Sequence, residues 1–334
     1  MSDGQRCAVV GAGAWGTALA DLLARNGHRT ILWAREADVV EAVNGRRENP
    51  RFLPGVPLDP ALRATGSVEH AVAGCALVVF APPSHVLRAV AASTARAIPP
   101  GATLAVASKG IERDSLAVMT DVVASAVPDR AVVAVSGPSF AAEVARRQPT
   151  AVVAACADSA AARLVQHALS TSDFRVYTHD DVLGVELGGA LKNVMAVATG
   201  MVEGLGLGFN ARAALITRGL AEMTRLGVAL GARPATFAGL AGVGDLVLTC
   251  TGALSRNRAV GEEIGRGRSL AEVLTGRETV AEGVLNAQSA RALAARAGVE
   301  MPIVNAVHRI LFEGAAVGDA VGELMSRTPR AEQD

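Results

Sequence analysis

The chain contains 334 residues, of which 32 are basic and 32 acidic, so its formal net charge at pH 7 is zero. Such a balance creates no field of one sign that would attract nucleic acid or an anionic membrane surface. Aromatic residues make up only 3% of the chain, which argues against platforms for stacking bases. The length favours two domains, and an apolar content of 50% is sufficient for a substantial core.

Several features predict a soluble, cytoplasmic protein that binds no metal. The apolar stretch 182–209 is long enough to cross a membrane, but glycines and ionisable residues interrupt it. Residues 1–6 are polar and run straight into a strand pattern, so we expect no signal peptide. The cysteines lack C-x-x-C spacing, so neither a zinc site nor a redox motif is indicated; they are Cys7, Cys75, Cys156 and Cys250.

Residues 1–185 alternate short apolar runs with helical patterns, which predicts an α/β, Rossmann-like domain with a mainly parallel sheet. Several runs are continuously apolar, as expected for strands that are covered on both faces. The predicted strands are 7–10, 30–33, 76–81, 103–107, 132–135, 151–155 and 174–177. The predicted helices between them are 17–26, 86–97, 116–126, 140–147 and 160–169.

The strand signal stops at about residue 181, and residues 186–330 are predicted to form an all-α domain. The predicted helices are 182–203, 211–230, 235–240, 258–264, 270–274, 284–297 and 303–312. This shift in pattern places the domain boundary near 180–188.

The letters GAGAWG at 11–16 follow the first predicted strand and open the first predicted helix. In a dinucleotide-binding loop, the first glycine (Gly11) permits the tight turn and the second (Gly13) lets the backbone approach a pyrophosphate. The third, Gly16, lets the helix pack against the strand, and the helix N-terminus adds N–H donors for the phosphates. This context favours a dinucleotide site over an ordinary strand–turn–helix connection.

The end of the second predicted strand bears on the choice of cofactor. An arginine there suits the 2′-phosphate of NADP(H), whereas an acidic residue bonds the ribose 2′-hydroxyl of NAD(H). The chain has Arg35 followed directly by Glu36. We therefore expect NADP(H) to be preferred, with NAD(H) possible. The alternative for Arg35 is a surface cation in a loop.

Two further polar segments follow predicted strands, at the sheet edge where doubly wound folds bind their ligands. Lys109 lies in SKG at 108–110, where it would meet the cofactor or an anionic substrate. The letters SGPSFA at 136–141 open a helix, so their hydroxyl and N–H groups would hold an oxygen-rich ligand. Either segment alone would be explained as a turn.

Lys192 lies in an apolar, glycine-rich stretch whose only other ionisable residues are Glu186 and Glu203. Lysine is rarely buried without a partner, and burial favours its neutral form, which suits proton transfer. Gly188 and Gly189 occupy the helical turn before it, so we expect open space beside the ammonium. The alternative is a lysine that extends its ammonium to water.

Two segments of the helical half carry further candidates. Asp245, in GDLVLTC at 244–250, either caps a helix or pairs with Lys192. The letters SRNR at 255–258 begin a predicted helix, and an arginine fork beside a helix N-terminus predicts a phosphate clamp. A solvated basic turn is the alternative for this second segment.

Together these segments resemble the soluble bacterial NAD(P)-dependent glycerol-3-phosphate dehydrogenases. The matching letters are GAGAWGTALA at 11–20, ASKGIE at 107–112, SGPSFAAEV at 136–144, ELGGALKNV at 186–194, NARAALITRGLAEM at 210–223, and GDLVLTC with SRNR at 244–258. The resemblance spans nearly the whole chain, weakens after about residue 285, and is most specific in GGALKN and SRNR. It implies a Rossmann domain, a helical domain, a homodimer, and interconversion of dihydroxyacetone phosphate and sn-glycerol 3-phosphate.

By position, the resemblance implies that Lys192 is the general acid/base. The other implied substrate contacts are Lys109, Gly137, Ser139, Asn193, Asp245 and Thr249, with Ser255, Arg256 and Asn257 at the phosphate. The implied cofactor contacts are Gly11, Gly13, Ala14, Trp15, Gly16, Arg35, Phe52, Lys109, Ala141, Arg256, Val280 and Glu282. Two positions depart from the family pattern. Ala14 lacks the hydroxyl or amide that is often found there, and Phe52 stands where tyrosine is frequent.

The residues and the resemblance both imply the reduction of a small phosphorylated ketone. The resemblance further implies that the product supplies glycerophospholipid synthesis. Hydride from NAD(P)H would reach the carbonyl carbon, and protonated Lys192 would give a proton to the oxygen. A dehydrogenase for a carboxylated substrate, such as ketopantoate or a 3-hydroxyacid, is one alternative, although it would not need the clamp at 255–257. A non-catalytic NADPH sensor is another, and it would leave Lys192 unexplained.

Overall fold

The computed structural model describes residues 4–276, 281–329 and 331–332. The chain forms two compact units, one of Met1–Gly189 with Ala232–Asp245 and one of Ala190–Gly231 with Leu246–Asp334. Helix α8 (Val182–Gly204) starts in the first unit and continues into the second. The segment 232–245 belongs to the first unit, although the residues before it, 190–231, belong to the second. The chain therefore passes between the units three times, whereas the sequence predicted a single boundary near 180–188.

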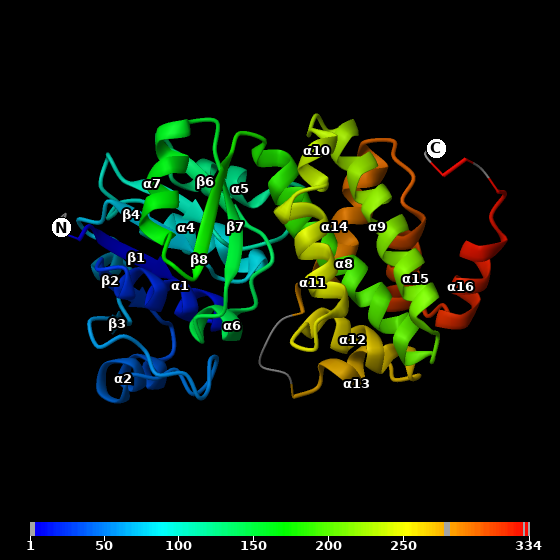
Figure 1. Ribbon diagram of the computed structural model, residues 1–334, viewed down its shortest axis with the longest axis horizontal. Helices are drawn as coiled ribbons and strands as arrows, with labels where there is room; N and C mark the ends of the chain where they lie inside the picture. The colour runs from blue at the N-terminus through cyan, green and yellow to red at the C-terminus, as the bar shows by residue number, and fades with distance from the viewer. Residues whose placement is uncertain (1–3, 277–280, 330, 333–334) are drawn as a thin grey trace. The chain divides into compact units, whose positions relative to one another are not determined.

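The first unit contains an eight-stranded sheet with the strand order β3-β2-β1-β4-β5-β6-β7-β8 (Figure 1). The strands are β1 (Arg6–Val10), β2 (Arg29–Trp33), β3 (Arg63–Thr65), β4 (Leu77–Phe80), β5 (Thr103–Val106), β6 (Val132–Ser136), β7 (Thr150–Ala155) and β8 (Phe174–His179). Every neighbouring pair is parallel except β6 with β7, which is antiparallel. The predicted α/β class is therefore confirmed. The chain reverses its direction across the sheet between β1 and β4, and such a switch point opens a ligand crevice.

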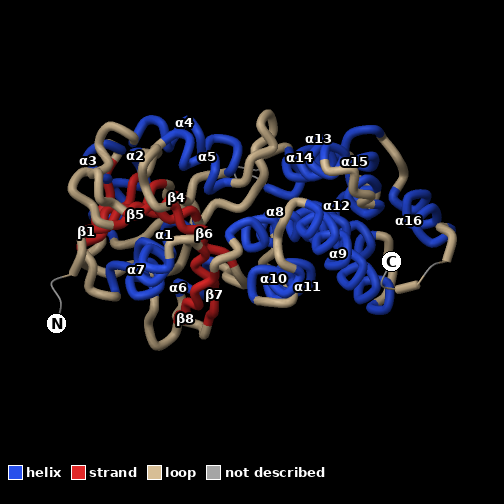
Figure 2. The backbone as a smooth tube through the Cα atoms, turned by 90° about the horizontal axis from the view of Figure 1, so that it is seen from above, coloured by secondary structure: helices blue, strands red, loops and turns tan. Residues whose placement is uncertain are grey.

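Helices cover both faces of this sheet, because successive side chains of its central strands point to opposite cores. Val9 of β1 belongs to one buried cluster and its neighbour Val10 to the other. Figure 2 shows α1 and α7 on one side of the strands and α4 and α5 on the other. The helices of this layer arrangement are α1 (Ala14–Arg25), α2 (Ala37–Arg46), α3 (Val68–Val72), α4 (Leu87–Thr94), α5 (Met119–Ala126), α6 (Ala141–Ala145) and α7 (Ser159–Leu169), with the 3-10 turn η1 (Ser84–Val86).

Three elements in the segment between β2 and β4 were not predicted, namely α2, α3 and β3. Helix α3 has five residues and β3 has three, too few to produce a clear periodic pattern. Helix α2 buries only Val39, Ala42 and Val43 along its length, so its apolar signal is weak.

The second unit is built from helices. They are the later part of α8, then α9 (Phe209–Ala229), α11 (Asp245–Thr251), α12 (Arg256–Gly265), α13 (Leu270–Leu274), α14 (Glu282–Arg296), α15 (Pro302–Glu313) and α16 (Val317–Ser326). Helix α10 (Pro234–Phe237) and the π-helical turn η2 (Leu240–Gly244) lie in the segment that belongs to the first unit. Helix α16 was not predicted; Gly314, with φ of +75°, ends α15 shortly before it.

The glycines of α8 have a packing role. A Cβ added to Gly200 would lie 2.0 Å from the carbonyl oxygen of Arg258, and one added to Gly261 would lie 2.0 Å from that of Val197. Backbone therefore meets backbone where α8 packs against α12, and only glycine allows this approach.

Two segments are long and apolar enough to cross a membrane, by length and composition alone: Val182–Gly204 and Pro234–Thr251. The sequence had led us to expect none, because of the interruptions in α8. Of the apolar window in α8, 89% is buried inside the protein, and core helices of globular proteins pass the same test.

Candidate active site

The glycine loop has the geometry that a dinucleotide site requires. Gly11 has φ of +115°, and a Cβ there would lie 2.8 Å from the backbone nitrogen of Pro82. A Cβ on Gly16 would lie 1.8 Å from the carbonyl oxygen of Gly11, so α1 packs directly on the turn. Beside Gly13, by contrast, no atom lies within 4 Å of the Cβ position. The loop thus has a tight turn, a close helix contact and an open side where a pyrophosphate can approach.

The other expected cofactor residues of the first unit lie around this loop and at the ends of neighbouring strands. Ala14 begins α1, and the buried indole nitrogen of Trp15 has no hydrogen-bond partner among the described residues. Arg35 follows β2 with 81% of its side chain exposed, and its guanidinium pairs with Glu36 at 2.9 Å. Phe52 packs beside the guanidinium of Arg51, at 5.3 Å from the ring centre.

A second cluster joins four of the predicted residues at the carboxyl edge of the sheet. The Lys109 ammonium donates to the carboxylate of Asp245 at 2.6 Å and to the carbonyl oxygen of Gly137 at 3.0 Å. Ser139 donates to that same carbonyl at 2.9 Å, and Ala141 begins the helix that follows. The carboxylate and ammonium are largely withdrawn from water, with side-chain exposures of 1% and 16%. An ion pair in this setting is strong and holds Lys109 in one orientation.

Asp245 is the first residue of α11, and its carboxylate pairs with Lys109. One expectation about the glycines before Lys192 is corrected. The space beside Gly188 and Gly189 is filled: a Cβ would lie 2.4 Å from the carbonyl oxygen of Ala241 at the first and 2.6 Å from the Ser136 hydroxyl at the second. These glycines allow close packing of their backbone against neighbouring groups.

In the second unit, Lys192 and Thr249 form a buried polar pair. The Lys192 ammonium donates to the Thr249 hydroxyl at 2.9 Å, and the two residues are 7% and 4% exposed. The lysine does not extend to water, which was the alternative that the sequence left open.

Asn193, the residue after Lys192, joins a separate chain of hydrogen bonds. Its side-chain oxygen accepts from the Asn257 amide at 2.8 Å, and the Asn257 oxygen accepts from the backbone N–H of Gly283 at 2.9 Å. Asn257 therefore connects α8, α12 and the start of α14. Glu282, the residue before Gly283, begins α14, whereas Val280 lies outside the described residues.

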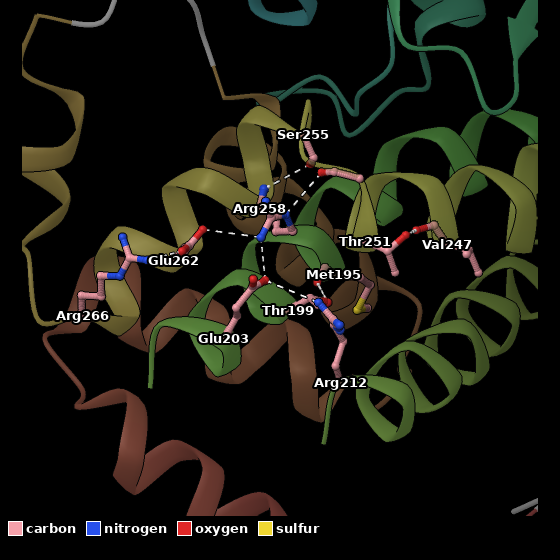
Figure 3. A network of polar contacts seen from close by, with 11 residues as sticks. Met195, Thr199, Glu203, Arg212, Val247, Thr251, Ser255, Arg258, Glu262 and Arg266 are labelled. Carbon is pink, nitrogen blue, oxygen red and sulfur yellow. Dashed lines mark hydrogen bonds and ion pairs between the residues drawn. The ribbon is translucent and has the colours of Figure 1, made fainter. Parts of the chain in front are cut away.

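The SRNR segment divides into residues with different surroundings. The Ser255 hydroxyl caps α12 by accepting from the backbone N–H of Arg258 at 3.2 Å. Arg258 donates to Glu203 at 2.6 Å and to the carbonyl oxygen of Gly252 at 3.3 Å, and thereby ties the end of α8 to the start of α12 (Figure 3). No described residue forms a hydrogen bond or ion pair with the Arg256 guanidinium. Desolvation lowers its pKa, and the charge of Glu282 opposes that shift.

The sequence did not assign a role to Glu186, and it named Ser136 only within the segment 136–141. The buried carboxylate of Glu186 accepts from the backbone N–H of Thr120 at 3.0 Å and from its hydroxyl, so it anchors the start of α5. Burial raises the pKa of Glu186 to about 7. The Ser136 hydroxyl is buried without a hydrogen-bond partner among the described residues. The sequence signal for Glu186 is its position as one of only two acids in an apolar helix.

A Rossmann sheet with an open glycine loop, together with a helical unit that buries a lysine, defines a dinucleotide-dependent dehydrogenase. The sequence profile for the N-terminus of NAD-dependent glycerol-3-phosphate dehydrogenase matches residues 6–162, and the profile for its C-terminus matches residues 181–322. The chain belongs to the NAD-dependent glycerol-3-phosphate dehydrogenase family, as the resemblance in its motifs had indicated.

Individual relatives agree with this assignment. The chain is 56% identical over 332 residues to a glycerol-3-phosphate dehydrogenase (NAD(P)+) of Geobacter sulfurreducens, covering 98% of this chain and 99% of the relative. It is 54% identical over 333 residues to that of Geobacter metallireducens, covering 99% of each. The crystal structure of glycerol-3-phosphate dehydrogenase from Coxiella burnetii is similar with a TM-score of 0.93 and 40% identity, covering 97% of this chain and 99% of that one.

Proposed function

We propose that the protein catalyses the reversible, NAD(P)H-dependent reduction of dihydroxyacetone phosphate to sn-glycerol 3-phosphate. The observation that carries this proposal is the buried Lys192, whose ammonium is held 2.9 Å from the Thr249 hydroxyl in a chain of this family. Its expected role in the cell is to supply glycerol phosphate for glycerophospholipid synthesis.

In the proposed reaction, Lys192 acts as the general acid. When bound, the reduced nicotinamide supplies the hydride that reaches the carbonyl carbon of the substrate. Negative charge then develops on the carbonyl oxygen. The Lys192 ammonium donates a hydrogen bond to that oxygen and gives up its proton, while Thr249 holds the side chain in place. In the reverse direction, neutral Lys192 removes the proton from the hydroxyl group.

Lys109 has a second part in this proposal. Its ammonium is fixed by Asp245 and by the carbonyl oxygen of Gly137, so it is presented in one orientation. A fixed ammonium favours an anionic substrate and stabilises charge that develops during the reaction. Gly137, Ser139 and Asn193 complete the expected contacts with the substrate.

We assign the substrate phosphate to the start of α12. The Ser255 oxygen accepts the bond that caps the helix, and the Asn257 amide donates to Asn193. The donors proposed for the phosphate are the Ser255 O–H, the Arg256 guanidinium and the first backbone N–H groups of the helix. A helix N-terminus with an arginine is a suitable phosphate site. Ser255 and Asn257 also fix the shape of this turn through their bonds to protein groups.

The proposed cofactor site uses the glycine loop, with Ala14 and Trp15 at the start of α1, and with Phe52, Ala141 and Glu282. The open side at Gly13 supports this assignment. We expect NADP(H) to be preferred because Arg35 lies beyond β2 in the position for a 2′-phosphate, with NAD(H) also accepted. We further propose a cytoplasmic homodimer, which sedimentation analysis would distinguish from a monomer.

The alternatives that the sequence left open are less well supported. A ketopantoate or 3-hydroxyacid dehydrogenase would share the Rossmann fold, but the relatives above all carry the glycerol-3-phosphate dehydrogenase name over nearly the whole chain. A non-catalytic NADPH sensor would give no reason for a buried lysine and threonine pair.

The decisive experiment measures the oxidation of NADPH, and separately of NADH, by absorbance. Dihydroxyacetone phosphate is the acceptor, with ketopantoate as the comparison. We expect rapid oxidation with the phosphorylated ketone alone. Rapid oxidation with ketopantoate alone would replace the substrate assignment. Binding of NADPH by folded protein without oxidation of either acceptor would favour the sensor.

A further inference from the structure

We infer that Asn49 is a positioning residue that sets the direction in which the glycine loop presents its backbone donor to the cofactor. Asn49 follows α2, outside every motif identified above, and it is fully buried with 0% exposure. Its side-chain amide donates to the carbonyl oxygen of Ala12 at 2.9 Å and to the hydroxyl of Thr17 at 2.8 Å. The inference deepens the proposed function, because it rests on use of this loop for the pyrophosphate.

The hydrogen bonds around Ala12 form a closed set. The Thr17 hydroxyl donates to the same carbonyl oxygen at 3.1 Å while it accepts from Asn49. A carbonyl oxygen can only accept, so the atom of Asn49 that faces it must be the amide nitrogen. The other end of the side chain is also fixed, because its oxygen accepts from the backbone N–H of Phe52 at 3.1 Å. Both hydrogens of the amide are therefore directed at the loop.

The direction of this contact matters because a peptide group is planar. The carbonyl oxygen of Ala12 and the N–H of Gly13 belong to one trans peptide and point in opposite directions. Two buried donors hold the carbonyl towards Asn49 and Thr17, so the N–H of Gly13 is directed away from them. No described residue accepts a hydrogen bond from that N–H, and the Cβ position of Gly13 is open to beyond 4 Å. Asn49 thus aims an unused donor at the side where a pyrophosphate can approach.

The same residue also fixes one of the predicted cofactor contacts. The backbone carbonyl of Asn49 accepts from the N–H of Leu53 at 2.9 Å, which closes the turn that carries Phe52. One buried amide therefore couples the position of the glycine loop to that of the segment 49–53. An ordinary structural asparagine would link only elements that lie away from the ligand.

Asn44 provides a matched control in the same unit. Its amide donates to the carbonyl oxygen of Ala64 at 2.9 Å, and its oxygen accepts from the Ala64 N–H at 2.9 Å. It thus fixes backbone with the same chemistry and at similar distances, but it joins α2 to β3. The variants N49D and N44D change one atom each at comparable bonds.

The test measures the dissociation constants for NADPH and for ADP-ribose by titration, with melting temperature and steady-state kinetics on the same samples. N49D places an oxygen against the Ala12 carbonyl, so the peptide must rotate or lose its donor. We expect both dissociation constants to rise about ten-fold or more, from the scale of a lost or repulsive hydrogen bond. The KM for NADPH should rise with them, while the KM for dihydroxyacetone phosphate and kcat at saturating cofactor change little. N44D should lower the melting temperature without a change in either dissociation constant.

The outcomes separate the inference from the proposed function. Wild-type affinity for NADPH in folded N49D, or an equal loss of affinity in N44D, would overturn the role of Asn49 alone. Absence of NADPH binding by the wild-type protein would overturn the proposed use of the loop as well. If N49D does not fold, T17V removes the hydroxyl that donates to Ala12 while keeping the side-chain shape. Unchanged NADPH affinity in folded T17V would then count against the inference.

Discussion

The ammonium of Lys192 donates to the hydroxyl of Thr249 across 2.9 Å, and both side chains are buried. A hydroxyl is neutral, so it directs the lysine without cancelling its charge. An ammonium has three donors, and a general acid in the proposed reaction needs one of them to face the substrate oxygen. In the proposed reaction, Lys192 is the acid and Thr249 is one group that orients it.

Replacement of Lys192 by alanine should lower kcat by more than about 100-fold, which is the usual scale of acid–base catalysis. The dissociation constant for NADPH should remain close to that of the wild type, because the glycine loop lies on other elements. Stopped-flow or steady-state measurement of NADPH oxidation, paired with a binding titration, checks both quantities. Near-normal turnover in a folded variant would refute the assignment.

Arg256 and Arg258 should behave differently, although they are two positions apart. R256A should raise the KM for dihydroxyacetone phosphate with little effect on kcat, because a phosphate contact is made equally in the ground and transition states. R258A removes the bonds to Glu203 and to the Gly252 carbonyl, so it should lower the melting temperature. Kinetics and thermal unfolding of both variants test this division. A loss of kcat at unchanged KM in R256A would contradict it.

The sequence predicted the features whose signals lie within a short stretch of the chain. It did not predict contacts between residues that are far apart in the chain. The Rossmann sheet followed from apolar runs and the loop at 11–16, because each signal is local. The partner of Asp245 was not predicted, since Lys109 is 136 residues away. Gly188 and Gly189 were misinterpreted for the same reason, because the groups that fill their space come from Ala241 and Ser136.

Arg35 should discriminate between the cofactors, and Glu36 should moderate its effect. Their guanidinium and carboxylate pair at 2.9 Å on an exposed surface, so the pair is weak and a 2′-phosphate can compete for the arginine. R35A should weaken NADPH binding more than NADH binding, whereas E36Q should improve NADPH relative to NADH. The ratio of the two KM values measures this preference. Equal losses for both cofactors in R35A would make it a surface charge only.

The contribution of Glu186 to the stability of the protein should fall as pH rises from about 4.5 to about 7. Burial raises the pKa of Glu186 from 4.5 to about 7, and the nearby charge of Asp121 adds to the shift, while bonds from Thr120 oppose it. The folded state therefore keeps a proton that the unfolded state has lost within this window. The stabilisation is complete below pH 4.5, is lost as pH rises through about 7, and changes no further above that value.

The variant E186Q tests this pH dependence, because glutamine resembles the protonated acid at every pH. Its free energy of unfolding should fall less steeply than that of the wild type between pH 5 and 7, by roughly 3 kcal/mol over the full window. Some slope should remain, since burial also raises the pKa of Glu222 to about 7. Glu41 is exposed on α2, so E41Q serves as the control and should follow the wild type. Denaturant unfolding at several pH values gives the slopes, and identical slopes for E186Q and E41Q would show that Glu186 does not titrate in this range.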